Sequence, residues 1–319
     1  MIFKMVAARL AIAVPLVVVA TFVVFSLSVF LPGDAALTLA GEGASPERVA
    51  EVRETLRLDD PLIERYGAWL GDALDGDLGT SLFSKAPVTQ ELAEKWPVSA
   101  SLLALSVVFA FLIGLPAGIL AAVHRGTSLD RSATIAATVG MSIPPFVLGI
   151  FLVIVFGVWL RVLPVGGYTT FSDSPAGWFR SLLLPALALS GVMAATLARQ
   201  LRGSLADVLD EEYIRTARAK GLKGTSIVMR HGLRMAAGPV ASVMAIAIGR
   251  LVGGAIVVES VFNLPGLGPW LVSALLSRDL PVVLGVVPFT VVLVVLLNLS
   301  ADVIRGMLDP RYVGEQVTS

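Results

Sequence analysis

The segment of residues 10–31 restricts the fold more than any other feature of this chain, because its 22 residues include no charged side chain. A helix that crosses a bilayer needs about 20 mostly apolar residues, whereas the apolar core of a cleaved signal peptide is shorter. The run ends at Pro32-Gly33-Asp34 rather than at a small-residue cleavage site, so we expect a retained membrane helix. Comparable apolar runs follow at 99–123, 132–157, 181–198, 235–259 and 281–304. The sequence therefore predicts an all-α polytopic membrane protein with six transmembrane helices.

The composition agrees with this class and excludes several others. Hydrophobic residues make up 56% of the 319 residues and charged residues only 15%, against about 25% charged residues in soluble domains. Lys and Arg balance Asp and Glu at 24 each, so the basic excess of a nucleic-acid-binding protein is absent. There is no cysteine, and the two histidines, His124 and His231, both lie between the apolar runs. We therefore expect no disulfide, no metal site, no nucleic-acid partner and no catalytic residue in this chain.

The distribution of charge between the runs predicts the orientation in the membrane. Residues 1–9, 124–132, 199–235 and 305–319 together hold 14 basic and 7 acidic residues. The segments on the other side hold 9 basic and 15 acidic residues, and they are 31–98, 158–180 and 260–280. Because Lys and Arg concentrate in cytoplasmic loops, we expect the first set, which includes both termini, to be cytoplasmic.

The long outer segment of residues 32–98 predicts short helices rather than another span. Ser45 followed by Pro46 is a typical helix start, and a second amphipathic stretch carries Leu62, Tyr66 and Trp69 at near-helical spacing. We favour a small solvated cap that is tied to the first span. A docking surface for an extracytoplasmic partner, or a substrate lid, stays open as the other interpretation.

The cytoplasmic loop of residues 199–234 is the most informative segment. Gly221 ends a predicted helix, as a glycine at a C-terminal cap does, and a short second helix is expected at 225–230. Glu211 and Arg215 stand four apart in the favourable order for a helical ion pair. One face of the predicted helix is apolar and carries Leu205, Val208, Leu209, Tyr213 and Ala217. Membrane anchoring explains the basic charge of the loop but not this face, so we predict that the face binds a partner protein.

Few charges lie within the apolar runs, which disfavours transport coupled to an ion gradient. Only Arg250, Glu259 and Asp302 lie within the runs or at their edges, whereas a proton-coupled transporter usually places several ionisable groups near the midplane. Arg250 is expected to meet a substrate carboxylate or to form a structural pair, and we favour the pair. The partner in such a pair would be Glu259 or the partner chain, but Glu259 would stand about 13 Å further along a straight helix, which disfavours a direct pair between the two. The small-residue pairs Gly114–Gly118 and Gly249–Gly253 are interpreted as helix-packing sites.

A series of motifs resembles one known family over nearly the whole chain. The loop sequence EYIRTARAKGL at 212–222 resembles the ATPase-coupling loop of bacterial ABC importer permeases, specifically the B-type permease subunit of the dipeptide, oligopeptide and nickel group. Arg215-Thr216-Ala217 stands where the general importer motif has Glu-Ala-Ala, a variation that the peptide group shares. Further motifs follow in the order of that group, and they are LPGD at 31–34, LDDPL at 58–62, GDLG at 76–79, FNLPGLG at 262–268, RDLP at 278–281 and LDPR at 308–311.

The resemblance implies a binding-protein-dependent inner-membrane component with the architecture of a type I ABC importer permease. Its parts would be an N-terminal transmembrane helix at 1–31, an extracytoplasmic cap at 32–98, a five-helix permease core at 99–304 with the coupling loop at 199–234, and a cytoplasmic tail at 305–319. The residues implied in ATPase coupling are Tyr213, Arg215, Thr216, Ala217, Ala219, Lys220, Gly221 and Leu222. The residues suggested for the translocation path are Pro144, Pro145, Arg250 and Glu259.

The same resemblance implies the partners and the substrate class. A homologous C-type permease would complete the path in the bacterial cell membrane, two ATPase subunits would bind ATP and Mg²⁺, and an extracytoplasmic binding protein would deliver the substrate. This chain has no Walker A pattern for phosphate binding, so we expect no cofactor within it. Dipeptides or oligopeptides are the expected substrates, with nickel chelates, haem and glutathione as alternatives. A stand-alone channel or facilitator and an intramembrane enzyme are disfavoured alternatives of other classes.

Overall fold

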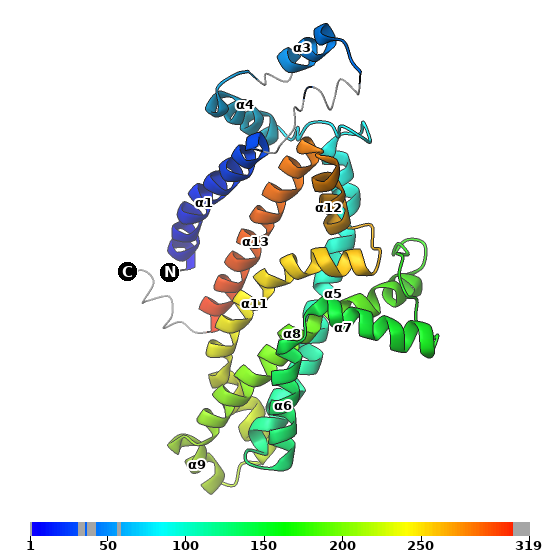
Figure 1. Ribbon diagram of the computed structural model, residues 1–319. Helices are drawn as coiled ribbons and strands as arrows, with labels where there is room; N and C mark the ends of the chain where they lie inside the picture. Colours follow the sequence, from blue (N-terminus) through cyan, green and yellow to red (C-terminus); the bar gives the residue numbers. More distant parts are fainter. Residues whose placement is uncertain (1, 31–35, 37–42, 56–58, 309–319) are drawn as a thin grey trace. The chain divides into compact units, whose positions relative to one another are not determined.

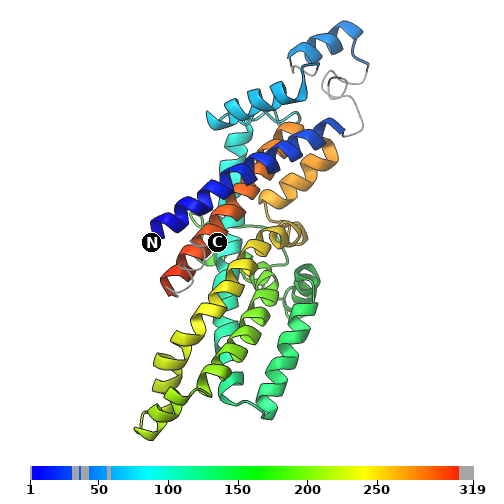
Figure 2. The same ribbon diagram turned by 90° about the vertical axis from the view of Figure 1, so that its left-hand side faces the viewer.

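The computed structural model describes residues 2–30, 36, 43–55 and 59–308. These residues form helices and loops, with one isolated antiparallel bridge between Thr80 and Pro87. They divide into two compact units, one built on residues 2–10, 97–269 and 294–308 and the other on residues 11–96 and 270–293. Figures 1 and 2 show the helices from two sides. The predicted motif at 31–34 and the predicted tail beyond Leu308 lie outside the described residues, as does the side chain of Asp302.

In chain order the helices are α1 (Ile2–Phe30), α3 (Pro46–Thr55), α4 (Leu62–Leu74), α5 (Val88–Val123), α6 (Ser128–Ser142), α7 (Pro145–Leu152), the π-helix η1 (Val153–Trp159), α8 (Pro175–Leu209), α9 (Glu212–Ala219), α10 (Gly224–Ser226), the π-helix η2 (Ile227–Gly232), α11 (Leu233–Val261), α12 (Leu267–Ser277) and α13 (Leu280–Leu308).

Four helices in the described part of the chain are long and apolar enough to cross a membrane, namely Val88–Val123, Pro175–Leu209, Gly224–Val261 and Leu280–Ala301. A fifth candidate is a bent pair, α6 followed by α7 and η1, whose two halves are bent by 103°. Ala11–Ser26 within α1 and Leu267–Ser277 are shorter apolar helices. The fold is thus that of an all-helical membrane protein with four or five candidate spans.

The prediction of one unbroken span at 132–157 is wrong, because two prolines interrupt it. α6 ends at Ser142, and Pro144 stands in an extended conformation before the first residue of α7, Pro145. A proline lacks the backbone N–H that continues a helix and disfavours the helical conformation of the residue before it. Proline is nevertheless well suited to the first position of a helix. The pair therefore ends one helix and starts the next.

The predicted loop at 199–234 is more helical than expected. α8 continues eleven residues beyond the predicted end at 198, because strong helix formers such as those in the segment LARQLRGSLADVL carry it to Leu209. The short helix predicted at 225–230 is instead the beginning of a long one, since α10, η2 and α11 follow one another without a break from Gly224 to Val261. Only residues 210–223 interrupt the two long helices.

α8 is the central helix of the first unit. In its most apolar window 72% of the residues are buried, compared with 33% in each of the other three long helices, and it packs against α6, α7 and α11. A Cβ atom on Gly114 of α5 would lie 2.7 Å from the carbonyl oxygen of Ala194, and one on Gly118 would lie 2.9 Å from that of Ala198. The packing interpretation is confirmed for these two glycines. At Gly253 an added Cβ would meet nothing within 4 Å, so this glycine forms no close packing contact within the described part of the chain.

The second unit is held by aromatic and polar contacts of the predicted cap. The ring of Tyr66 on α4 packs edge-on against Phe22 and Phe25 of α1, and its hydroxyl lies 2.8 Å from that of Thr21. The buried Asp279 carboxylate accepts hydrogen bonds from the Ser81 hydroxyl and from the Leu82 N–H, at 2.5 and 3.1 Å. A Cβ on Gly79 would lie 3.6 Å from that of Pro281, so the motifs at 76–79 and 278–281 also lie side by side in this unit.

Candidate coupling surface and translocation residues

The helix that carries the predicted coupling residues, α9, is anchored by one side chain. Ile214 is 0% exposed and belongs to the hydrophobic core of the first unit, together with Leu209 and Ile227. An eight-residue helix is too short to be stable alone in water, so this contact is what keeps α9 helical and in place. The sequence analysis did not single out Ile214, although it falls within the motif at 212–222.

A Schellman motif ends α9. The N–H of Gly221 donates to the carbonyl of Arg218 at 2.9 Å, and the N–H of Leu222 donates to the carbonyl of Ala217 at 3.2 Å. Gly221 has φ +76°, a backbone conformation that side chains with a Cβ rarely adopt. The prediction that Gly221 caps this helix is confirmed. A Cβ on Gly221 would meet nothing within 4 Å, so the surface around this residue is open.

Most of the predicted coupling residues lie on the outer side of α9 and of the turn that follows it. Ala217 is half-buried, and the exposed residues are Tyr213, Arg215, Thr216, Ala219, Lys220, Gly221 and Leu222. The predicted apolar face does not bind a partner through its leucines, because Leu205 and Leu209 are buried in the core of this chain. Tyr213 and Leu222, exposed to 43% and 42%, are the large apolar side chains that the predicted coupling residues present.

The predicted ion pair between Glu211 and Arg215 does not form. Glu211 stands at the N-cap of α9 in an extended conformation, because the chain breaks after α8 and the helix begins only at Glu212. The Arg215 guanidinium lies 3.8 Å from the Glu212 carboxylate instead, and both side chains are well exposed. An exposed pair of this kind contributes little to stability, so Arg215 is available to a partner.

An open cavity of about 610 Å³ lies beside α9 and is lined by Tyr213, Arg230, His231, Arg234 and Met235. Partial burial raises the pKa of the Tyr213 phenol above its ordinary value, and the Glu211 carboxylate adds to the shift. The basic residues of η2 and α11 thus lie beside the coupling helix.

The four residues suggested for the path differ in environment. Pro144 is exposed and Pro145 half-buried at the bend of the α6–α7 pair. Arg250 is exposed on α11 and has no ion-pair or hydrogen-bond partner among the described residues. Its helix neighbour Gly249 lies against Asn298 of α13, where an added Cβ would be 3.2 Å from the amide oxygen.

Glu259, the fourth residue, has its partners within the chain. It is 1% exposed, and its carboxylate accepts a hydrogen bond from the Gly268 N–H at 2.7 Å and one from the Ser99 hydroxyl. The same hydroxyl accepts the Leu267 N–H at 2.9 Å. Glu259 therefore ties the end of α11 to the start of α12 and to α5, and the predicted alternative of a pair with Arg250 is not formed.

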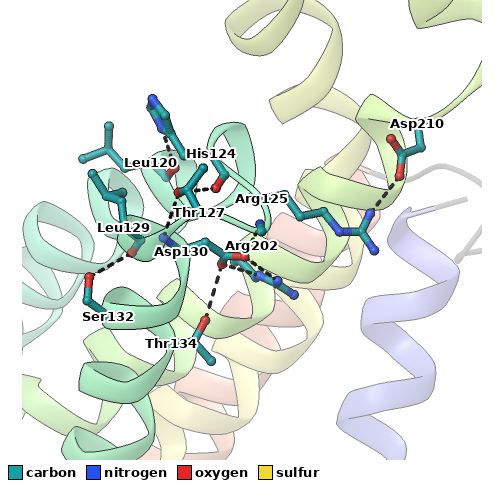
Figure 3. A network of polar contacts seen from close by, with 11 residues as sticks. Leu120, His124, Arg125, Thr127, Leu129, Asp130, Ser132, Thr134, Arg202 and Asp210 are labelled. Carbon is teal, nitrogen blue, oxygen red and sulfur yellow. Dashed lines mark hydrogen bonds and ion pairs between the residues drawn. The ribbon is translucent and has the colours of Figure 1, made fainter.

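Sequence reasoning missed a polar network at the end of α8, which Figure 3 shows. Asp130 of α6 and Arg202 of α8 form a doubly hydrogen-bonded ion pair, with both N–O distances 2.9 Å. Arg125 and Asp210 form a second, exposed pair at 2.7 Å. The local signal was Thr127 with an acid three residues later, a helix-start pattern. This pattern predicts that a helix begins at Thr127, but not that Arg202 lies beside Asp130.

The fold and these features define a class before any relative is considered. The chain is a helical membrane protein with a short, exposed helix between two long ones, and its described residues contain no group of three or more His, Asp or Glu that could hold a metal ion. The sequence profile for binding-protein-dependent transport system inner membrane components matches residues 114–314, and the profile for the N-terminal part of such components matches residues 1–103. The chain belongs to this family.

Named relatives agree over nearly the full chain. A putative peptide transport system permease protein of Brucella abortus is 41% identical over 95% of this chain and 96% of its own length. The glutathione transport system permease protein GsiC of Shigella flexneri is 40% identical, with the same coverage. The dipeptide transport system permease protein DppB of Escherichia coli K12 is 36% identical, again over 95% of this chain and 96% of its own length.

Solved structures support the fold. Chains from two crystal forms of the inward-facing MetNI methionine ABC transporter superpose with TM-scores of 0.55 and 0.58, at 21% and 22% identity. They cover 68% and 69% of this chain. The protein is therefore a non-catalytic, multi-pass permease component of an ABC transporter in the inner membrane, homologous to permeases of peptide and glutathione systems. Its dependence on a binding protein implies binding-protein and ATPase partners.

Proposed function

We propose that this chain forms half of the translocation path of an ATP-driven peptide importer. A homologous C-type permease forms the other half, two ATPase subunits bind ATP and Mg²⁺, and an extracytoplasmic binding protein delivers the substrate. The chain crosses the membrane six times with both termini in the cytoplasm. The family membership supports this assembly, and the excess of basic residues on one side of the membrane supports the orientation.

The observation that carries the coupling role is the arrangement of α9. Ile214 holds the helix to its own permease, while Tyr213, Arg215 and Lys220 face outward. A rigidly mounted helix with an exposed outer side can transmit a push from an ATPase. The open space around Gly221 lets the partner backbone approach closely. Thr216, Ala217, Ala219 and Leu222 complete the contact.

The path runs along the bend at Pro144-Pro145 and along the exposed side of α11 at Arg250. A charged side chain at membrane depth is costly unless it is paired or faces water, and Arg250 has no partner among the described residues. It therefore faces the water-filled path. Glu259, which is buried at the end of the same helix, acts on the path by fixing the loop that follows α11.

Dipeptides or oligopeptides are the substrates that fit best, since relatives at 36% to 41% identity are named for peptide, dipeptide and glutathione transport. Glutathione is itself a small peptide and is the nearest alternative. Nickel chelates and haem are more distant ones. Ligand binding to the binding protein that copurifies with the complex separates these substrates.

The test of coupling uses two nearly isosteric variants, Gly221→Asp and Gly221→Asn. Asp and Asn both tolerate a positive φ, so both preserve the cap, and they differ in charge. In proteoliposomes with the partner subunits and the loaded binding protein, we expect Gly221→Asp to keep ATP hydrolysis and lose uptake, with Gly221→Asn less affected. Normal uptake at normal stimulated hydrolysis in Gly221→Asp would refute the coupling role, and uptake by this chain alone would refute the importer.

The orientation has a separate test, which the absence of cysteine makes clean. Single cysteines are introduced at two exposed positions, Ser84→Cys and Thr225→Cys. With a membrane-impermeant maleimide on intact spheroplasts, we expect labelling at residue 84 and, only after permeabilisation, at residue 225. The reverse pattern would overturn the proposed topology.

A further inference from the structure

The carboxylate of Asp130 has a complete set of partners at the start of α6. Arg202 donates from Nε to Oδ1 and from Nη2 to Oδ2, both at 2.9 Å, and the Gly126 N–H donates to Oδ2 at 2.9 Å. The Asp130 side chain is 5% exposed and that of Arg202 is 33% exposed. Bidentate contacts between arginine and a carboxylate are among the strongest and most directional hydrogen bonds in proteins. This pair therefore fixes both the distance and the rotation of α6 on α8.

α6 packs against α8, and the ion pair is the charged contact between the two helices. Only Asp130 and Ala137 are buried among the fifteen residues of this helix. Nearer its other end, a Cβ on Gly140 would lie 3.3 Å from that of Ala195 on α8. Residue 130 meets residue 202 and residue 140 meets residue 195, so the helices run antiparallel. α6 is thus held by small-residue packing along its length and by the ion pair at its start.

The preceding loop links the same place to the coupling helix. The Arg125 guanidinium contacts the Asp210 carboxylate at 2.7 Å, and Asp210 is the residue that ends α8 just before α9. The loop is itself rigid, because the Thr127 N–H and hydroxyl both donate to the His124 carbonyl, at 3.1 and 2.6 Å. The two ion pairs therefore connect the loop before α6 and the first turn of α6 to the last turns of α8 (Figure 3).

We propose that Asp130 and Arg202 are positioning residues that transmit the movement of α9 to α6 and, through it, to the bend at Pro144. This inference rests on the proposed coupling role of α9. A push on α9 moves the end of α8 to which it is joined. The ion pair between Asp130 and Arg202 holds the start of α6 to that end of α8, so α6 moves together with it. Without the pair, α8 moves but α6 does not follow the displacement, so ATP is hydrolysed without opening the path.

The test measures peptide uptake per ATP hydrolysed in proteoliposomes that contain the whole complex. Asp130→Asn keeps the shape and removes the charge, and Arg202→Lys keeps the charge and removes the bidentate contact. We expect either variant to lower this ratio by about tenfold, with hydrolysis within about twofold of wild type. The double exchange Asp130→Arg with Arg202→Asp restores part of the ratio. Arg125→Gln breaks the second ion pair, which is exposed and therefore weak, so it should lower the ratio by less than about twofold.

A second readout separates transmission from mere stability. Spin labels on the exposed residues Ser132 and Asp207 report the distance between α6 and α8. In wild type we expect one narrow distance distribution that is the same with and without ATP, and in Asp130→Asn a broader distribution that changes with ATP. Uptake and hydrolysis that fall together in proportion to the amount of folded complex would show a purely structural pair and overturn the proposal.

An unchanged ratio in both single variants would also overturn it. If Gly221→Asp still uncouples in that case, the coupling role of α9 stands and only the transmission through Asp130 and Arg202 falls. If Gly221→Asp is also without effect, the proposed function of α9 fails as well.

Discussion

Replacing Ile214 with alanine tests whether α9 is held by its own permease before it meets an ATPase. The side chain is 0% exposed within a core that includes Leu209 and Ile227. Truncating a buried Ile to Ala costs about 2–5 kcal/mol, and less where the site can collapse. Because α9 lies at the surface, the lower part of that range applies, about 2–3 kcal/mol. At a factor of ten for each 1.4 kcal/mol, the balance between docked and undocked α9 shifts by roughly 30- to 150-fold.

Hydrogen exchange of the purified chain, without partner subunits, measures this shift. The amides of Lys220 and Leu222, which donate to Thr216 and Ala217 in the last turn of α9, should exchange faster in Ile214→Ala by a factor in that range. Tyr213→Ala is the matched control, because Tyr213 is next to Ile214 in the sequence but its side chain is 43% exposed. In this control, exchange of the same amides should stay within about threefold of wild type. Equal protection in Ile214→Ala and wild type would refute the anchoring argument, as would equal loss in the Tyr213→Ala control.

Three further predictions concern the membrane helices. Glu259→Ala leaves the buried Gly268 N–H without its acceptor, which costs about 1–3 kcal/mol. Thermal stability in detergent should therefore fall, while the substrate preference of uptake is unchanged. A changed preference at unchanged stability would instead show that Glu259 contacts the substrate in the path. Arg250→Gln should lower peptide uptake with stability intact, because Arg250 lacks a partner among the described residues; a loss of stability instead would identify a structural pair. Gly114→Ala overpacks the contact with α8 and should destabilise by about 1–3 kcal/mol, whereas Gly253→Ala, in open space, should be neutral or stabilising in the same melting assay.

The class of the protein could be predicted from the sequence because bilayer thickness imposes a length on apolar segments. Five of the six predicted runs coincide with parts of the long helices or of α1. Their ends could not be placed, since hydropathy marks where the membrane ends and not where the helix does. α5 begins at Val88, eleven residues before the predicted start at 99. α8 ends at Leu209, well beyond the predicted 198.

The candidate site could be predicted where local chemistry decides it. Gly221 was identified as a cap because a positive φ requires glycine, and the structure places it at φ +76°. The direction of the apolar side chains could not be predicted in the same way. A helical stripe looks the same whether it packs on its own chain or on a partner, and Leu205 and Leu209 pack on their own chain. The contact of Asp130 with Arg202 joins residues 72 apart in the sequence, beyond any local pattern.

These observations together explain why a short helix can serve as a lever. α9 cannot be stable by itself at eight residues, so its position is set by what it rests on, namely the buried Ile214 and the end of α8. α8 is in turn the most buried of the long helices, and a well-packed interior transmits displacement because it has few voids to absorb it. Force applied to the exposed outer side of α9 therefore enters the helix that packs against α6, α7 and α11. α6 has only Asp130 and Ala137 buried, and Asp130 provides its charged contact with α8, so the loss of this one charge should separate hydrolysis from transport.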